Sequence, residues 1–166
     1  DDEQGGVVSG ANGTARVALK PLQGDTRTES ELFRVSVFVR PLESESVEFQ
    51  FGIPRDGSAK AVGALRMSQR SAVAGMWLPG TEEFVKDRPE ISLREPTNGI
   101  YAVRLERQSR RWWAWINDKL IGGFDIAGPV DERPEMLVTV VGGTAWFSDM
   151  HRDDLLEPPS PDGSGD

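Results

Sequence analysis

The sequence predicts an all-β fold, an antiparallel two-sheet jelly-roll sandwich, in one domain. Many short segments alternate apolar and polar residues with the period of two that places one face of a strand in a core. Clusters of Gly, Pro, Asn and Asp separate these segments, and the 166 residues include 18 Gly and 11 Pro. No window sustains a helical period of useful length, so strands at this spacing indicate a sandwich or jelly roll.

The clearest single strand is segment 47–53. Val47, Phe49 and Phe51 share one face, while Glu48 falls on the other. The other expected strands are 14–20, 33–40, 62–68, 73–78, 91–94, 119–124, 136–141 and 144–150, with one helical turn at 82–87. The residues expected between the sheets are Phe33, Val35, Val37, Val47, Phe49, Phe51, Val103, Leu105, Trp112, Ile116 and Phe147.

The stretch 101–124 predicts a β-hairpin that is rich in tryptophan. Residues 101–106 alternate as a half-buried strand does, and residues 111–117 form a second extended segment. Asn117 and Asp118 then turn the chain, because Asn and Asp tolerate the positive φ that tight hairpin turns require.

Tryptophans occupy both faces of the second strand of this hairpin. Trp112 lies on one face, whereas Trp113 and Trp115 share the other. A two-layer β protein buries only one face of a strand against its partner sheet. We therefore expect Trp113 and Trp115, about 7 Å apart by strand rise, to point away from the main core.

Two interpretations of this outward pair stay open. With Arg104 from the neighbouring strand, Trp113 and Trp115 would form a stacking surface for sugar rings, whose C–H faces pack on indoles. Trp77, at a strand end near a loop, is a further candidate ligand-binding residue. Alternatively, segment 69–99 covers the two indoles, which then belong to a secondary core.

Composition and charge exclude several classes of site. The chain has no Cys, so it has neither a disulfide framework nor a thiolate metal site. The net charge of −8 lies mostly in the ends, with −3 in residues 1–3 and −4 from residue 151 onward. The body is close to neutral and has no basic face, which argues against a nucleic-acid partner.

The ends of the chain predict its domain boundaries. We expect a flexible N-terminus at 1–10, the β-sandwich at 11–155, and a disordered tail or linker at 156–166, where Pro, Gly, Ser and acids predominate. No apolar run approaches a membrane span. Because the chain begins with Asp, we expect a processed form or a piece of a larger protein, extracytoplasmic or secreted. The oligomeric state is open.

The order of the segments resembles the concanavalin A-like lectin/glucanase superfamily, above all its laminin-G-like and 3-keto-disaccharide hydrolase-like domains. The resemblance covers residues 30–155 and rests on 101–106, 114–120 and 142–150, which match a "y-v-r-l-e" strand, a "v-y-v-n-G-k-l" hairpin and a closing "G-g-x-a-x-F-x-d-v". Asp118 departs from the pattern, which usually has Gly there. The resemblance implies a jelly roll, and activities vary widely across this superfamily.

Chemistry-bearing motifs are scarce in this sequence. Glucanases of the superfamily carry acids alternating along one strand, and no such array occurs here, so we expect no catalytic residues and lean against an enzyme. The single histidine, His151, has no second His or Cys with which to hold a transition metal. We expect no cofactor, although the resemblance leaves calcium open, with Asp149 or Asp153 as oxygen ligands.

These observations favour a non-catalytic carbohydrate-binding or accessory module of a larger protein. The alternative is a structural or protein-interaction domain used as laminin-G-like domains are, and a carbohydrate-active hydrolase is the third hypothesis. The expected partner is a glycan or a protein. The first two hypotheses differ in whether Trp113 and Trp115 lie exposed beside polar groups.

Overall fold

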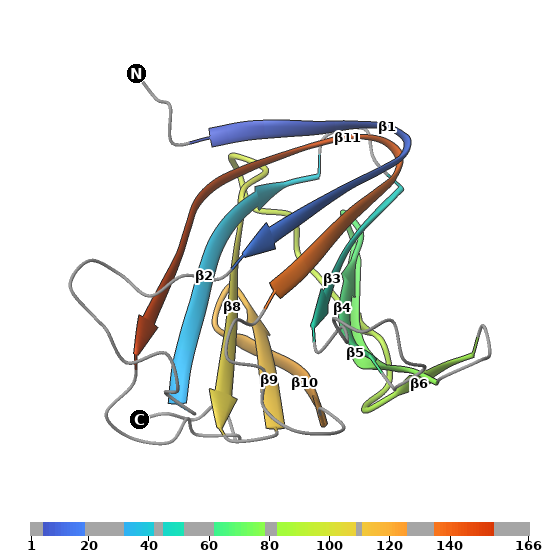
Figure 1. The fold of residues 1–166 in the computed structure, drawn as a ribbon. Coiled ribbons are helices and arrows are strands. Elements are labelled where there is room, and N and C mark those ends of the chain that lie inside the picture. The colour runs from blue at the N-terminus through green and yellow to red at the C-terminus, as the bar shows by residue number, and fades with distance from the viewer. Residues whose placement is uncertain are drawn as a thin grey trace.

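A computed structural model of the chain describes residues 5–18, 32–41, 45–51, 62–78, 83–108, 111–125 and 135–154. Within these ranges all regular structure is β, and no helix is long and apolar enough to cross a membrane. The strands are β1 (Gly5–Ala18), β2 (Leu32–Arg40), β3 (Ser46–Phe51), β4 (Val62–Met67), β5 (Ser71–Trp77), β6 (Phe84–Lys86), β7 (Ile91–Ser92), β8 (Tyr101–Gln108), β9 (Arg111–Ile116), β10 (Lys119–Asp125) and β11 (Glu135–Asp154) (Figure 1).

All of these strands belong to one antiparallel sheet that folds back on itself. The order is β10-β9-β8-β2-β11-β3-β4-β5-β6, with β1 paired along β11 and β7 paired with β5. The C-terminal half of β11 pairs with β2 and its N-terminal half with β3. We call the first side (β10, β9, β8, β2) sheet I and the second side (β3, β4, β5, β6) sheet II; Figure 1 shows β1 and β11 bending over both.

The core lies between sheets I and II and draws on both. It consists of Val35, Val37, Val39, Val47, Phe49, Leu65, Met67, Ala72, Ala74, Tyr101, Val103, Leu105, Trp112, Ala114, Ile116, Ile121, Phe124, Val138, Val140 and Ala145. The two-sheet jelly roll predicted from the sequence is confirmed, as is the inward position of eight of the predicted core residues. Phe147 packs against this core, with its ring edge-on to Phe49 at 6.1 Å. The side chains of Phe33 and Phe51 fall outside the described part of the chain.

The predicted turn at the tip of the hairpin is also present. Asn117 and Asp118 both have positive φ, 50° and 65°, as a two-residue turn between paired strands requires. Asp118 therefore adopts the conformation for which the superfamily pattern uses Gly. Farther along the hairpin, Phe124 stacks on Trp112 at 6.2 Å and packs against Gly63, where an added Cβ would lie 2.0 Å from the ring.

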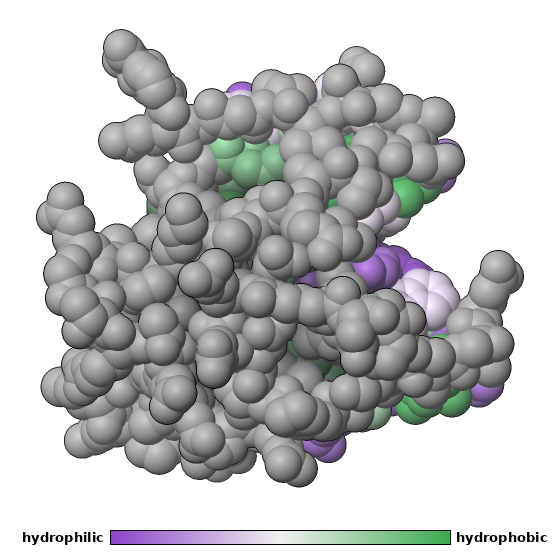
Figure 2. All heavy atoms as spheres, viewed as in Figure 1, coloured by the Kyte–Doolittle hydropathy of each residue, from purple (hydrophilic) through white to green (hydrophobic). Residues whose placement is uncertain are grey.

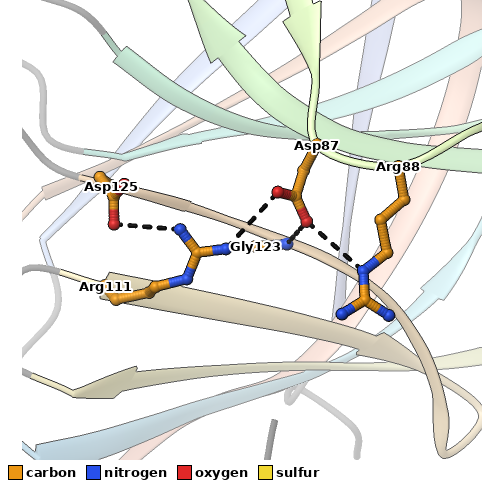
Figure 3. Close-up of polar contacts among 5 residues, drawn as sticks. All are labelled: Asp87, Arg88, Arg111, Gly123 and Asp125. Atoms are coloured by element: carbon orange, nitrogen blue, oxygen red, sulfur yellow. Dashed lines mark hydrogen bonds and ion pairs between the residues drawn. The ribbon is translucent and has the colours of Figure 1, made fainter. Parts of the chain in front are cut away.

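Asp87 ties the free edge of sheet I to the edge of sheet II. The backbone N–H of Asp87 donates to Ala74 O (2.8 Å) in β5, and the Asp87 carboxylate accepts the backbone N–H of Gly123 (2.9 Å) in β10. Arg111 approaches the same carboxylate at 3.5 Å, and Arg88 does so at 3.6 Å (Figure 3). An edge strand left unpaired tends to pair with other chains, and Asp87 covers part of this edge with a hydrogen bond and two cations.

The helical turn expected at 82–87 is wrong, and the domain boundaries stay a prediction. Residues 5–10 are part of β1 and pair with β11. Residues 84–86, inside the segment expected as a helical turn, form β6 on the edge of β5. The predicted tail at 156–166 lies outside the described residues.

Truncation of Phe49 tests the inward assignment. Phe49 is fully buried, so Phe49→Ala should cost about 3–5 kcal/mol of unfolding free energy and lower the melting temperature strongly. Phe38→Ala is the matched control, because Phe38 is 42% exposed and its truncation removes little buried area. Equal effects of the two substitutions in thermal unfolding would contradict the assignment.

Candidate functional site

The outer face of sheet I carries the predicted tryptophan pair, and it buries one of the two. Trp115 is only 1% exposed, so of the two interpretations left open by the sequence, the covered one applies to this indole. The Arg104 guanidinium lies 4.6 Å from the centre of the Trp115 ring, a cation–π contact that covers the indole. The Trp115 Nε1–H is buried and has no hydrogen-bond partner in the described part of the chain. A sugar ring cannot stack on Trp115 unless Arg104 moves.

Trp113 is half-buried and has an arginine of its own. The Arg111 guanidinium lies 4.4 Å from the centre of the Trp113 ring. Arg111 also forms ion pairs with Asp125 at 3.1 Å and Asp87 at 3.5 Å. Two parallel arginine–tryptophan stacks therefore cover much of this face. Whether Trp113 and Arg104 contact a ligand stays a prediction.

A buried carboxylate completes the outer face of sheet I. Glu106 is 5% exposed and pairs with Arg34 Nε at 3.0 Å. Arg104 Nε lies 3.3 Å from the same carboxylate oxygen, an ion-pair contact without hydrogen-bond alignment. Arg104 also reaches Asp118 at 3.4 Å. Arg34, Arg104 and Arg111 are thus each paired with an acid or an indole of the chain itself, which suits a secondary packed layer.

The outer face of sheet II places Trp77 beside a second buried carboxylate. Glu48 on β3 is 8% exposed and accepts three hydrogen-bonding side chains. Its donors are Gln50 Nε2 at 2.6 Å, Trp77 Nε1 at 3.2 Å and Arg66 Nη2 at 3.3 Å. The paired cation and the two neutral donors offset the cost of desolvating this carboxylate. We call these four residues the Glu48 cluster.

Trp77 is the aromatic residue of this cluster. Its ring is half-buried and packs against Phe84 on β6 at 5.2 Å. The guanidinium of Arg66 lies 5.2 Å from the Trp77 ring and 4.8 Å from the Phe84 ring. Figure 2 shows hydrophilic and pale side chains in a recess on the side of the molecule that β4, β5 and β6 form, next to hydrophobic ones. The indole is therefore held in a fixed orientation by groups from three strands.

The Glu48 cluster combines an indole with amide and guanidinium groups. An indole packs against the apolar face of a pyranose or furanose ring, and fixed amide and guanidinium donors hydrogen-bond its hydroxyls. Sequence reasoning found Trp77 and the outward direction of Glu48. It missed Arg66, because only the register Glu48↔Arg66 between β3 and β4 brings that guanidinium to the carboxylate.

Tyr101 and a loop close one end of the sandwich. The buried phenol donates a hydrogen bond to the backbone carbonyl of Gln69, and Arg40 donates to Asn98 O at 2.7 Å. Burial, and secondarily the negative charge of Glu95, raise the pKa of Tyr101 above its usual 10.0. The phenol therefore stays neutral and holds the β4–β5 turn against β8.

The described residues contain no metal centre of the kind that side chains alone would form. No group of three or more His, Asp or Glu in these ranges could hold an ion. The backbone of Asp149, His151 and Asp153 belongs to β11, and their side chains fall outside the described part of the chain. The expectation about calcium is therefore untested.

Comparisons with known proteins support the fold. No family model matches the sequence, and no curated protein sequence does. Among solved structures, a carbohydrate-binding module, CBM66 from Bacillus subtilis, matches with a TM-score of 0.55 and 12% identity over 86% of this chain and 81% of that one. A family 7 alginate lyase in complex with substrate matches with a TM-score of 0.55 and 10% identity, covering 89% of this chain and 72% of that one. A sialidase matches with a TM-score of 0.53 and 11% identity over 93% of this chain but only 15% of its own length.

The likeness to these structures, at identities of 10–12%, is one of fold. It shows that the chain has a jelly-roll β-sandwich fold, as predicted from the sequence. The matched proteins include both a binding module and enzymes, so function must come from the residues of the site.

The pH dependence of unfolding tests whether the Tyr101 phenol is buried at the end of the sandwich. The unfolded chain loses the phenol proton near pH 10 and the folded chain retains it, so unfolding free energy should fall as pH rises above about 10. Tyr101 is the only tyrosine, so its ultraviolet difference spectrum reports this one group, and Tyr101→Phe should lose less stability over about pH 9–11 than the parent. A phenol that titrates at or below its usual pKa in the folded protein would contradict the assignment.

Proposed function

We propose that this chain is a non-catalytic carbohydrate-binding module of a larger protein, with its ligand on the outer face of sheet II against Trp77. The observation that carries the proposal is the Glu48 cluster: a buried carboxylate that fixes a half-exposed indole, an amide and a guanidinium on one sheet face. Aromatic and polar groups held in this way characterise sites for small polar ligands. The shared fold of the carbohydrate-binding module supports it.

The hydrogen bonds that the Glu48 carboxylate already accepts favour binding over catalysis. Glycoside hydrolysis needs a pair of carboxyl groups, one to donate a proton and one to attack or activate water. Within the cluster Glu48 is the only carboxylate, and Gln50, Trp77 and Arg66 already donate to it. Such a carboxylate orients its neighbours and has little remaining capacity to attack a substrate.

The affinity of a single site of this kind should be modest. A stacked indole contributes about 0.5–1.5 kcal/mol beyond its area burial, and the exposed part of Trp77 admits one ring. We therefore expect dissociation constants in the range from about 1 mM to 1 μM. Modules with such affinities serve best as parts of larger or multivalent proteins.

One observation favours the alternative, a protein-interaction domain. Phe38 on the outer face of sheet I is 42% exposed, and large exposed apolar side chains often mark contact surfaces. Phe38 lies on sheet I, whereas the Glu48 cluster lies on sheet II. A substitution at each position therefore separates the two functions.

A binding assay on three variants tests the proposed site. Soluble neutral and uronate-containing oligosaccharides are titrated while tryptophan fluorescence is followed, and the strongest ligand is carried forward. Trp77→Ala should weaken binding at least about tenfold, the equivalent of about 1.4 kcal/mol. Trp77→Phe should retain part of the affinity, because it keeps a ring but loses the N–H bond to Glu48.

Trp113→Ala is the matched control from the other face. It removes an indole of similar burial from sheet I and should leave the affinity within about twofold, a change of about 0.4 kcal/mol. Circular dichroism and thermal unfolding confirm that each variant is folded. If Trp113→Ala abolishes binding while Trp77→Ala does not, the site lies on sheet I, and the assignment to sheet II is wrong.

A further inference from the structure

A separate hollow lies at one end of the sandwich, away from the Glu48 cluster. Residues 92–97, which run from the end of β7 into the segment after it, form one wall, and Ile116, Asn117 and Lys119 at the tip of the β9–β10 hairpin form the other. Its volume is about 450 Å³, within the range of about 300–1,000 Å³ found for small-molecule sites. We call it the end pocket.

Backbone hydrogen bonds hold both walls of the end pocket in place. The N–H of Leu93 donates to Arg70 O at 2.7 Å, and the N–H of Gly99 donates to Pro96 O at 2.9 Å. On the opposite wall, Asn117 Oδ1 accepts the N–H of Ala102 at 2.8 Å, which turns the amide Nδ2 donor away from that bond. A pocket that is already formed loses little conformational entropy when a ligand enters.

The end pocket has an apolar floor. Ile116 is 1% exposed, and Leu93 is half-buried against the core. Pro96 adds a rigid ring to the same wall. A floor of this kind packs against the flat side of a ring rather than against a free ion.

The lining of the end pocket includes two cations, Arg94 and Lys119. Arg34, Arg66, Arg104 and Arg111 on the outer faces all form ion pairs with acids of the chain. Within the described ranges, Arg94 and Lys119 form none, and both are exposed. Two cations left unpaired at the mouth of a hollow, in a chain of net charge −8, are available to an anionic group.

The lining of the end pocket contains one acid, Glu95. Glu95 also borders a second hollow of about 300 Å³, which Arg40 and Tyr101 line. After burial, the charge of Glu95 is the second cause of the raised pKa of Tyr101, which places that carboxylate close to the phenol. The two cations of the lining, Arg94 and Lys119, therefore outnumber its one acid.

We propose that the end pocket binds a small ring-bearing carboxylate, a molecule of the size of a hexuronate. Its carboxylate pairs with Lys119 and Arg94, its ring packs on Leu93 and Pro96, and the Asn117 amide donates to an oxygen of the ligand. This site is independent of the glycan site proposed on sheet II, and either can exist without the other.

Titration of the full 166-residue chain by ¹H–¹⁵N NMR tests the proposal with three probes: sodium glucuronate, glucose and sodium cyclohexanecarboxylate. Glucuronate should shift the backbone amides of Asn117 and Lys119 saturably, and glucose should not. If cyclohexanecarboxylate also shifts these amides, the carboxylate and the ring are sufficient for recognition. If glucuronate shifts them and cyclohexanecarboxylate does not, the pocket also contacts the hydroxyl groups. Equal responses to glucose and glucuronate, or no response to either carboxylate, would overturn the proposal.

Charge-removing substitutions distinguish binding in the end pocket from non-specific attraction of the anion to surface cations. Lys119→Gln and Arg94→Gln should each weaken glucuronate binding about fivefold or more, as loss of one charge-assisted contact does. Lys86→Gln makes the same change at an exposed lysine of β6 outside the pocket lining, and it should leave the titration unaltered. If Lys86→Gln weakens binding as much as Lys119→Gln, the attraction is non-specific and the end pocket is not the site.

Discussion

Strand β11 hydrogen-bonds into both sheets, and the positions of the other strands follow from the place where it bends. Gly142, with φ of 78°, lies between the half that pairs with β3 and the half that pairs with β2. Left-handed backbone is accessible to Gly without the steric cost that other residues bear. The bend turns the inward faces of β2 and β3 toward one another, so that Val35 and Phe49 join one core, and it leaves two outer faces open to different uses.

The two outer faces stabilise a buried carboxylate in different ways. Each carries tryptophan, arginine and a buried glutamate on neighbouring strands, and a buried carboxylate requires paired donors. On sheet I, Arg104 covers Trp115 and pairs with Glu106. On sheet II, Glu48 holds the indole N–H of Trp77 itself, which fixes the ring while part of it remains accessible. The difference lies in which partner the carboxylate takes, and it makes sheet II the better candidate for a ligand surface.

Periodicity along the strands was enough to predict the fold and most of the core, because alternation in segments such as 47–53 reports directly which side chains face inward. It also predicted the Asn117–Asp118 turn from residues that tolerate positive φ. It failed where the outcome depends on partners across strands. Burial of Trp115 depends on Arg104 lying opposite it in register, and the pairing of Glu48 with Arg66 depends on the β3–β4 register. Neither contact can be predicted from the sequence of a single strand.

The central claim is that the ligand contacts the Trp77 side of the molecule. In the most direct measurement, an oligosaccharide ligand is titrated into the unaltered chain. The indole N–H signals of the five tryptophans are followed by ¹H–¹⁵N NMR. The Trp77 signal, which reports its hydrogen bond to Glu48, should shift most, and the Trp115 signal beneath Arg104 should stay in place. A dominant shift of Trp113 or Trp115, with Trp77 unmoved, would contradict the account.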